Sequence, residues 1–227
     1  LMSGSVANPL EVADWLRSHG RKVSLVTEGK RPVPLEEVFA EALLRRPFQG
    51  RKIRGHWPKL IHAALSANLG PLLVFAPRRK AAEELARQLA AELPEVDSLE
   101  LTTEQKKVGG KELVSLLKRR VAYHHSGLDY IKRAGLVEPL AKTGQLQVVV
   151  ATTGLAAGIN FSMRSVLVTD REYRTDEGVF LLRPDELLQM FGRAGRRGLD
   201  DRGYIIVAPK QARMADARPL KLKRSST

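Results

Sequence analysis

The stretch LLVFAPRRKAAEELARQLAAE, residues 72–92, decides the fold class. Its first five residues form a continuous apolar run of strand length, and the part from Pro77 to Glu92 places alanine and leucine on one helical stripe. The same alternation continues along the chain. We expect strands over 121–124, 145–151, 165–169 and 203–208, and helices over 111–120, 129–142 and 184–191. Strands alternating with helices predict βαβ units, and therefore an α/β fold with a mostly parallel sheet covered by helices on both faces.

The amino-terminal part carries weaker patterns. Residues 10–18 should form a helix with Asn8 as its cap. Residues 21–28 are a strand candidate, and residues 31–34, with two prolines, predict a stiff, extended connector.

Three further segments are less regular. Residues 95–110 are polar and typical of a loop. Asp129 should cap the helix over 129–142, and Pro139 should kink that helix or end it early. The segment from Lys210 to Thr227 is basic and polar, which predicts a linker or tail.

The charge of the chain indicates a polyanionic partner. Thirty-eight Lys and Arg residues stand against 25 Asp and Glu, a net charge of +13 over 227 residues. Such an excess favours nucleic acid, although an anionic membrane or an acidic protein would also fit. The apolar runs are too short to span a bilayer, so we expect no membrane partner. The absence of cysteine excludes structural disulfides and thiolate zinc sites. Nothing argues for secretion, and we expect a cytoplasmic protein.

Three segments end predicted strands or a helix with residue types suited to ligand binding. They are Val121–Gly127, Val148–Gly154 with its continuation to Asn160, and Gln189–Gly198. Ligands of a parallel sheet bind beyond the carboxyl ends of its strands. Taken alone, the first two segments are explained by ordinary turn chemistry, since Ser, Thr and Gly are common in turns. His124 and His125 lack a third ligand at metal spacing, so we predict no metal site there.

The third segment is harder to explain as an ordinary turn. Its glycines at 192, 195 and 198 would let the backbone approach a ligand closely. Arg193, Arg196 and Arg197 concentrate fixed charges that repel one another unless an anion lies among them. A solvated basic turn stays open as the alternative, although it does not explain the interleaved glycines. We therefore expect an anion-binding site in this segment.

In order and spacing, these segments resemble the later motifs of superfamily-two helicases. Leu73–Arg78 resembles motif four, Ala122–Leu128 motif four-a, Val150–Asn160 motif five and Gln189–Gly198 motif six. The doubled histidine, the Gly-Ile-Asn string and the Gly-Arg-Ala-Gly-Arg-Arg-Gly string resemble the superkiller-like, exosome-associated DExH-box family. Leu1–Pro9, the helix ending Asp-Trp-Leu16 and Arg31–Leu35 look like that family's motif three and its crossing into the second motor domain. Ser3-Gly-Ser5 departs from the family's usual Ser-Ala-Thr.

This resemblance implies a RecA-like, three-layer domain, the second motor domain of an ATP-dependent RNA helicase. ATP with Mg²⁺ would lie between this domain and an upstream RecA-like domain of the same polypeptide. The groups facing the nucleotide would be Arg193, Arg196 and Gln189, with Arg196 as the arginine finger. Gly158 and Asn160 would couple the nucleotide to the nucleic acid. Single-stranded RNA or DNA would be held through its backbone by Thr152, Thr153, Ser126, Gly127 and Arg78.

Missing motifs limit what the chain does alone. The sequence has no Gly-x-x-x-x-Gly-Lys-Ser/Thr phosphate loop and no Asp-Glu pair after a strand to hold Mg²⁺. We therefore expect the chain to start inside a longer polypeptide and to be inactive by itself. The resemblance divides it into the end of a first RecA-like domain with the crossover (1–30), the second RecA-like helicase domain (31–209) and a basic linker or tail (210–227).

Two other functions stay open. An ATP-dependent DNA helicase of the repair type would share the Leu-Ala-Ala-Gly string of motif five. A non-catalytic nucleic-acid-binding module would need none of the missing parts. The Arg-Arg-Gly ending of motif six, where repair relatives usually carry Arg-Pro-Gly, favours RNA.

Overall fold

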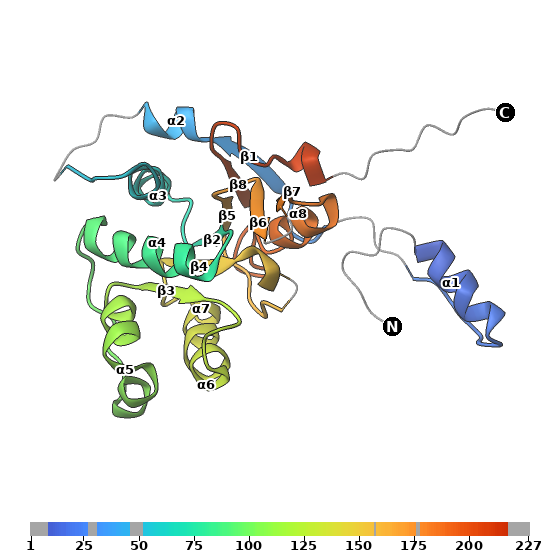
Figure 1. Ribbon diagram of the computed structural model, residues 1–227, viewed down its shortest axis with the longest axis horizontal. Coiled ribbons are helices and arrows are strands. Elements are labelled where there is room, and N and C mark those ends of the chain that lie inside the picture. Colours follow the sequence, from blue (N-terminus) through green and yellow to red (C-terminus); the bar gives the residue numbers. More distant parts are fainter. Residues whose placement is uncertain (1–8, 27–30, 46–51, 157, 176–177, 218–227) are drawn as a thin grey trace.

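A computed structural model describes residues 9–26, 31–45, 52–156, 158–175 and 178–217. Within these ranges the chain forms an α/β domain built on one parallel sheet, with helices on both faces (Figure 1). This is the RecA-like fold class expected from the sequence. No helix in the described part of the chain is long and apolar enough to cross a bilayer.

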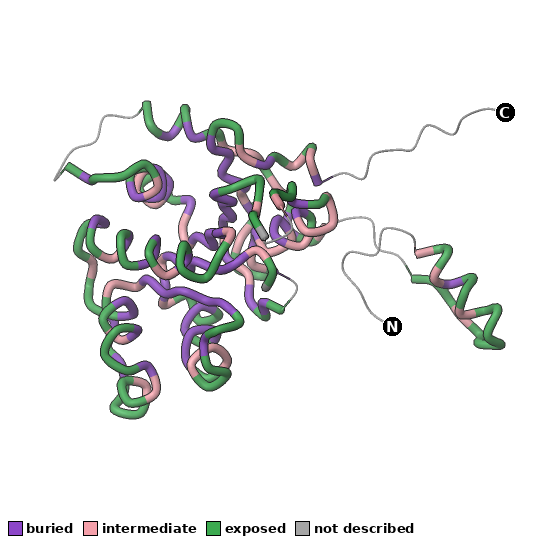
Figure 2. The backbone as a smooth tube through the Cα atoms, viewed as in Figure 1, coloured by how far each residue is buried: buried purple, intermediate pink, exposed green. Residues whose placement is uncertain are grey.

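The sheet has six strands in the order β1-β8-β5-β2-β4-β3, and every neighbouring pair is parallel. The strands are β1 (Leu35–Phe39), β2 (Leu72–Ala76), β3 (Val121–His124), β4 (Val148–Thr152), β5 (Ser165–Val168) and β8 (Gly203–Val207). Every residue of β2 and β4 is buried, and Figure 2 shows the central strands as buried tube. Burying one large apolar side chain such as Phe75 contributes about 1.5–3 kcal/mol.

Strand register brings the predicted motifs to one edge of the sheet. Ala76, the last residue of β2, pairs with Thr152, the last residue of β4. His124, the last residue of β3, pairs with Ala151. The segments that follow β2, β3 and β4 therefore emerge side by side.

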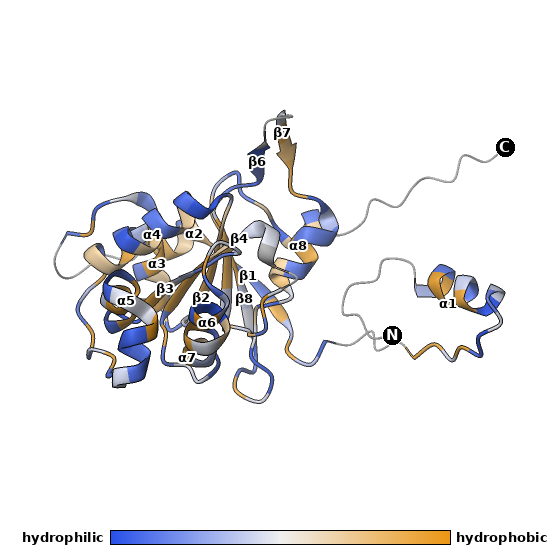
Figure 3. Ribbon diagram, turned by 60° about the horizontal axis from the view of Figure 1, so that its bottom comes forward, coloured by the Kyte–Doolittle hydropathy of each residue, from blue (hydrophilic) through white to orange (hydrophobic). Residues whose placement is uncertain are grey.

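The helices that flank the sheet bury apolar side chains against it. In Figure 3 the strands that they cover are coloured mostly hydrophobic. α3 and α4 lie on one face and α7 on the other (Figure 1). The helices are α1 (Pro9–Ser18), α2 (Ala40–Leu44), α3 (His56–Ser66), α4 (Arg79–Glu92), α5 (Thr103–Lys118), α6 (Tyr130–Lys132), α7 (Glu138–Lys142) and α8 (Pro184–Phe191). The expected strands and helices are confirmed apart from the differences described below, and β3 and α8 coincide with their predicted ranges.

The strand candidate over 21–28 is wrong for its described residues. Residues 21–26 lie outside the sheet and are largely exposed, because no described strand pairs with them. The first strand is instead β1, which begins directly after the connector over 31–34 and pairs with β8. Asn8 lies outside the described residues.

The predicted loop over 95–110 is also partly wrong, because α5 begins at Thr103. Thr102 and Gln105 form a reciprocal capping box: the Gln105 backbone N–H donates to Thr102 Oγ1 at 3.1 Å, and the Thr102 N–H donates to Gln105 Oε1 at 2.9 Å. The helix kinks at Gly110, whose φ of 68° is non-helical. The polar composition of this segment hides the helix start.

The helix over 129–142 does not end early at Pro139. A π-helical turn, η1 (Arg133–Val137), widens the helix just before the proline, and α7 then continues to Lys142. A wider turn relieves the clash that a proline ring makes with the carbonyl of the preceding turn. Asp129 occupies the N-cap position without a side-chain capping hydrogen bond, and its carboxylate lies 3.6 Å from Lys132 Nζ instead.

Several elements have no counterpart in the sequence prediction, among them α2, α3, β6 (Glu172–Thr175), β7 (Gly178–Leu181) and η3 (Met214–Ala217). β6 and β7 form an antiparallel pair apart from the main sheet. The 3₁₀ turn η3 packs on α8 and buries Ala217. The Met214 N–H donates to the carboxylate of Glu37 at 2.6 Å, so the stretch after Lys210 starts against the body of the domain. Residues 218–227 lie outside the described residues.

Candidate functional site

An open groove of about 650 Å³ lies at the carboxyl edge of β2 and β4. Its lining residues are Pro77, Arg78, Arg79, Lys80, Ala81, Thr152 and Gly154. Arg78 and Thr152, predicted as nucleic-acid-binding residues from two separate motifs, both line this groove. Arg79 and Lys80 line it too, although the sequence analysis did not predict them.

The groove has the charge of an anion site. The amino end of α4 opens into it, with Arg78 at the N-cap position and no side-chain cap on the first backbone N–H groups. A helix amino terminus carries a partial positive charge and presents unpaired N–H donors. Arg79 and Lys80, both exposed, add two full charges to it. Phosphate oxygens are the kind of ligand that such a groove binds.

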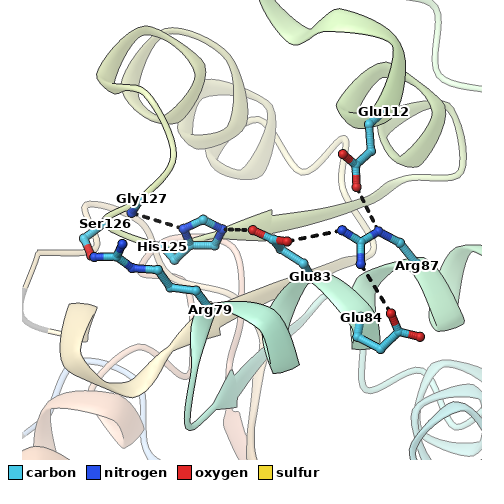
Figure 4. A network of polar contacts seen from close by, with 8 residues as sticks. All are labelled: Arg79, Glu83, Glu84, Arg87, Glu112, His125, Ser126 and Gly127. Atoms are coloured by element: carbon cyan, nitrogen blue, oxygen red, sulfur yellow. Dashed lines mark hydrogen bonds and ion pairs between the residues drawn. The ribbon is translucent and has the colours of Figure 1, made fainter.

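A hydrogen-bond network ties the turn after β3 to α4 (Figure 4). Arg79 Nη2 donates to Ser126 Oγ at 2.8 Å, and His125 Nε2 lies 2.9 Å from Glu83 Oε1. The Gly127 N–H donates to His125 Nδ1 at 3.1 Å. Because Nδ1 accepts this bond, the neutral imidazole carries its proton on Nε2 and donates it to Glu83. The Gly127 N–H, predicted as a phosphate donor, is thus already used within the protein.

The network continues along α4 to α5. Arg87 reaches Glu83 at 3.2 Å, Glu84 at 3.3 Å and Glu112 of α5 at 2.8 Å. The hydrogen bond to Glu112, followed by the other carboxylates, raises the pKa of Arg87. These exposed pairs add little stability. They do neutralise Arg87, so it is a poor phosphate ligand compared with Arg79.

The segment after β4 runs from the groove to the turn after α8. Thr152 is 8% exposed at the groove, and Thr153 starts the short 3₁₀ turn η2 (Thr153–Leu155). Gly158 and Asn160 are exposed further along. Arg193 Nε donates to the carbonyl of Ala156 at 3.2 Å, and this half-buried position lowers the pKa of Arg193 through desolvation.

The turn after α8 is also joined to the chain by its backbone. The Met163 N–H donates to the Arg193 carbonyl at 3.0 Å, and the Gly195 N–H donates to the Met163 carbonyl at 2.8 Å. The segment after β4 and residues 193–195, predicted from two separate motifs, therefore form one connected unit. Gln189 lies half-buried on α8, about one turn before Arg193.

Arg196 is held by an internal carboxylate. Its Nε and Nη2 donate to the two oxygens of Asp200, each at 2.8 Å, and its backbone N–H donates to Asp200 Oδ2 at 2.9 Å. The Asp200 side chain is 2% exposed, and that of Arg196 is 20% exposed. Asp200, four residues further on, therefore places a negative charge of the chain itself beside Arg196.

Gly195 has a structural reason that needs no ligand. Its φ is +82°, and a Cβ at this position would lie 2.6 Å from Val33 Cγ1 and 3.2 Å from Gly203 Cα. Gly198 has a φ of +79° with open space around it. Left-handed backbone at both positions, and close packing at the first, therefore account for these two glycines.

Comparison with known proteins agrees with this arrangement. The profile of the family described as "Helicase conserved C-terminal domain" matches residues 55–198, which is more than half of the chain. The match includes the groove and residues 192–198 after α8, which we call the arginine turn. The chain belongs to the helicase carboxyl-terminal domain family.

Several relatives of this helicase domain are DNA helicases by name. The chain is 33% identical over 208 residues to "ATP-dependent DNA helicase Hel308" of Thermoplasma acidophilum, covering 91% of this chain and 30% of the relative. The protein of the same name from Pyrococcus horikoshii is 33% identical, with 91% and 29% covered. "ATP-dependent DNA helicase homolog MER3" of Arabidopsis thaliana is 30% identical, with 92% and 20% covered. The chain thus spans less than a third of the length of these relatives.

These comparisons support the carboxyl-terminal domain of a superfamily-two helicase and do not confirm the superkiller-like branch. The superkiller-like, RNA-directed assignment is not supported, since the relatives are named as DNA helicases.

His124 has a packing role in this helicase domain. Its side chain is fully buried, and Nε2 lies 3.1 Å from Glu138 Oε1. Its ring packs edge-on against Phe161, with the two ring centroids 5.7 Å apart. Desolvation lowers the pKa of His124, against the effect of Glu138. Among the described residues, no group of three or more His, Cys, Asp or Glu side chains is placed to hold a metal ion.

Proposed function

We propose that this chain is the second motor domain of an ATP-dependent DNA helicase. It would grip the backbone of single-stranded DNA in the groove and present arginines to ATP bound by an upstream RecA-like domain. The observation that carries the proposal is the direct connection between the two places: Thr152 lines the groove, and the segment it begins binds Arg193 through the Ala156 carbonyl.

The grip on DNA rests on phosphate contacts. Arg78, Arg79, Lys80 and the amino end of α4 provide charge, and Thr152 provides a hydroxyl at the same edge. Ser126 and Thr153 lie beside them and complete the set, with Ser126 held in place by Arg79. Contacts of this kind position a strand without reading its bases, so sequence preference should be slight.

The nucleotide side rests on the turn after α8. The fork of Arg196 holds two carboxylate oxygens in bidentate geometry, so this guanidinium suits an oxyanion. We assign the γ-phosphate of ATP to Arg193, whose Nε is joined through the Ala156 carbonyl to the segment that begins at the groove, while Asp200 holds Arg196. Gln189 would line the same surface. ATP would supply the phosphoryl chemistry, and a divalent metal such as Mg²⁺ would be held mainly by the upstream domain.

The segment after β4 is the physical basis for coupling. It contacts the groove at Thr152 and pairs through Met163 with the backbone of Arg193 and Gly195. Gly158 and Asn160 lie between these ends. A conformational state that improves the arginine contacts must therefore also alter the groove, which is coupling by differential affinity for two states.

We propose DNA and not RNA as the substrate because the relatives are named as DNA helicases. The chain alone should not hydrolyse ATP, because the phosphate loop and metal carboxylates would come from the upstream domain. A non-catalytic binding module would keep the groove but would not need the buried arginine turn. We also propose a cytoplasmic location.

The test uses the full-length parent polypeptide and separates the two sites. Arg193→Ala should lower DNA-stimulated ATP turnover on the order of a thousandfold and leave DNA affinity nearly unchanged. Thr152→Val, which replaces the hydroxyl by a methyl group of similar size, should weaken DNA binding and DNA stimulation while sparing basal turnover. Arg197→Ala, an exposed neighbour on the same turn, is the matched control.

Two results would contradict the proposal. Loss of DNA binding with retained turnover in Arg193→Ala would mean that the arginine turn belongs to the groove. Stronger stimulation of the wild-type ATPase by single-stranded RNA than by DNA would favour the RNA helicase instead.

A further inference from the structure

Arg31 binds the backbone on both sides of Arg193. Its Nη2 donates to the carbonyl of Gly192 at 3.0 Å and to the carbonyl of Ala194 at 2.6 Å. Its Nε donates to the carbonyl of Val33 at 2.9 Å. One guanidinium thus joins the connector before β1 to the turn after α8, across 161 residues of sequence.

These carbonyls are a suitable target for a cation. Gly192 is the C-cap residue of α8, where helix carbonyls lack intrahelical donors and the helix end is partially negative. Among the described residues, Arg31 has no carboxylate within ion-pair distance, so carbonyl oxygens are the groups that hold its charge. Burial lowers the pKa of Arg31. A partly buried guanidinium held in this way is a costly feature for an ordinary connector.

A second contact holds the same turn from the same connector. Val33, 5% exposed, fills the space beside Gly195, where a Cβ would come within 2.6 Å of it. The Gly203 N–H donates to the Pro34 carbonyl at 2.9 Å, and β1 then pairs with β8. Residues 31–34, which we call the strap, therefore lie along the arginine turn and are fixed to the sheet at their far end.

We propose that Arg31 is a positioning residue that fixes the aim of Arg193. The side chain of Arg193 leaves the backbone between the two carbonyls that Arg31 holds. Its direction therefore depends on a peptide segment whose rotation the Arg31 fork restrains. This proposal rests on the proposed function, in which Arg193 serves the nucleotide. A displacement of about 1 Å in such a group costs on the order of a hundredfold in rate.

The chain offers a matched control and a graded substitution. Arg202 is exposed and directly precedes Gly203, to which the strap is fixed, and its side chain pairs with Glu36 at 2.7 Å. Arg202→Gln therefore removes the same charge near the strap without touching the arginine turn. Arg31→Gln removes the charge and the fork. Arg31→Lys keeps a charge that reaches a carbonyl but cannot bridge to Val33 at the same time, since the three donors of a lysine ammonium lie on one nitrogen and do not form a planar fork.

The first measurement is steady-state ATP turnover of the full-length parent with DNA. We expect Arg31→Gln to lower kcat on the order of tenfold to a hundredfold, with KM for ATP and DNA affinity within about twofold. Arg31→Lys should recover part of the loss, and Arg202→Gln should match the wild type. Equal kcat in Arg31→Gln and wild type would overturn the proposal.

The second measurement needs no nucleotide and uses this chain. Amide hydrogen exchange should become about tenfold faster or more at Gly195 in Arg31→Gln, while amides of β2 and β4 keep their wild-type rates. Faster exchange throughout the sheet would make Arg31 merely a stabilising residue and overturn the positioning role. If the wild-type parent has no ATPase, or Arg193→Ala keeps turnover, the proposed function fails, whereas unchanged exchange at Gly195 refutes the Arg31 clamp itself.

Discussion

The Arg196–Asp200 pair gives a prediction whose size follows from its burial. Asp200→Asn removes a charge that is 2% exposed and receives three hydrogen bonds from Arg196. Removing one member of a buried ion pair costs about 3–5 kcal/mol. Asparagine keeps one acceptor and Arg196 is partly hydrated, so we expect the lower end, about 3 kcal/mol. In a domain of this size that corresponds to a fall in Tm of about 6–12 °C.

The pH dependence of this effect has a defined sign. Burial opposes ionisation of Asp200, but the hydrogen bonds from Arg196 outweigh it, and the pKa of this carboxyl lies below its ordinary value of 3.8. A lowered pKa means that the pair contributes stability above the unfolded value and loses it as the pH falls through the folded value. The difference in unfolding free energy between wild type and Asp200→Asn should stay constant from pH 7 to about pH 4 and shrink below it.

Thermal and urea unfolding of the chain at several pH values measure both effects. Asp201→Asn, an exposed carboxylate one position along, is the matched control and should change Tm by less than about 1 °C. The prediction fails if Asp200→Asn has the same Tm as Asp201→Asn. It also fails if the loss of unfolding free energy in Asp200→Asn persists unchanged at pH values well below about 4. Either outcome would mean that Arg196 is not held by Asp200 in solution.

Two further substitutions test the turn and the groove. In a urea titration, Gly195→Ala should destabilise the chain by more than the roughly 1–2 kcal/mol that left-handed backbone costs alone, because its Cβ would also contact Val33. Gly198→Ala is the control: its φ is similar but the space around it is open, so it should show the backbone cost alone. Arg79→Gln should weaken single-stranded DNA binding and reduce the slope of log affinity against log salt concentration by about 0.7. Arg87→Gln is the control and should leave the slope unchanged, because three carboxylates neutralise Arg87. Equal slopes for the two variants would contradict the groove assignment.

Much of the fold followed from local pattern. β2 and β4 are continuous apolar runs buried on both faces, and α8 begins at a proline with acidic residues in its first turn, so sequence alone places them. β1, in contrast, reads LEEVF, with charged residues in an edge strand. Its strand character comes from pairing with the distant strand β8, and no local pattern carries that information.

The candidate site divides in the same way. The groove was half predicted, because Arg78 and Thr152 stand in recognisable strings, but the start of α4 one residue later brings Arg79 into the same groove. Asp200 had a local signal, an acid four residues after Arg196 with the spacing of a helical ion pair. Arg31 had none, since its partners are backbone carbonyls of a distant turn.

The arginine turn is held from three sides, and each contact comes from a different part of the chain. The strap over 31–34 holds its backbone through Arg31, the segment after β4 binds Arg193 through Ala156, and Asp200 holds Arg196. The first contact reaches toward the amino-terminal side of the chain and the second toward the groove. A displacement of the strap or of the segment after β4 would act on Arg193 through these hydrogen bonds. In the proposed motor domain, the position of Arg193 would therefore depend both on the connector and on what fills the groove, which is coupling by differential affinity for two states.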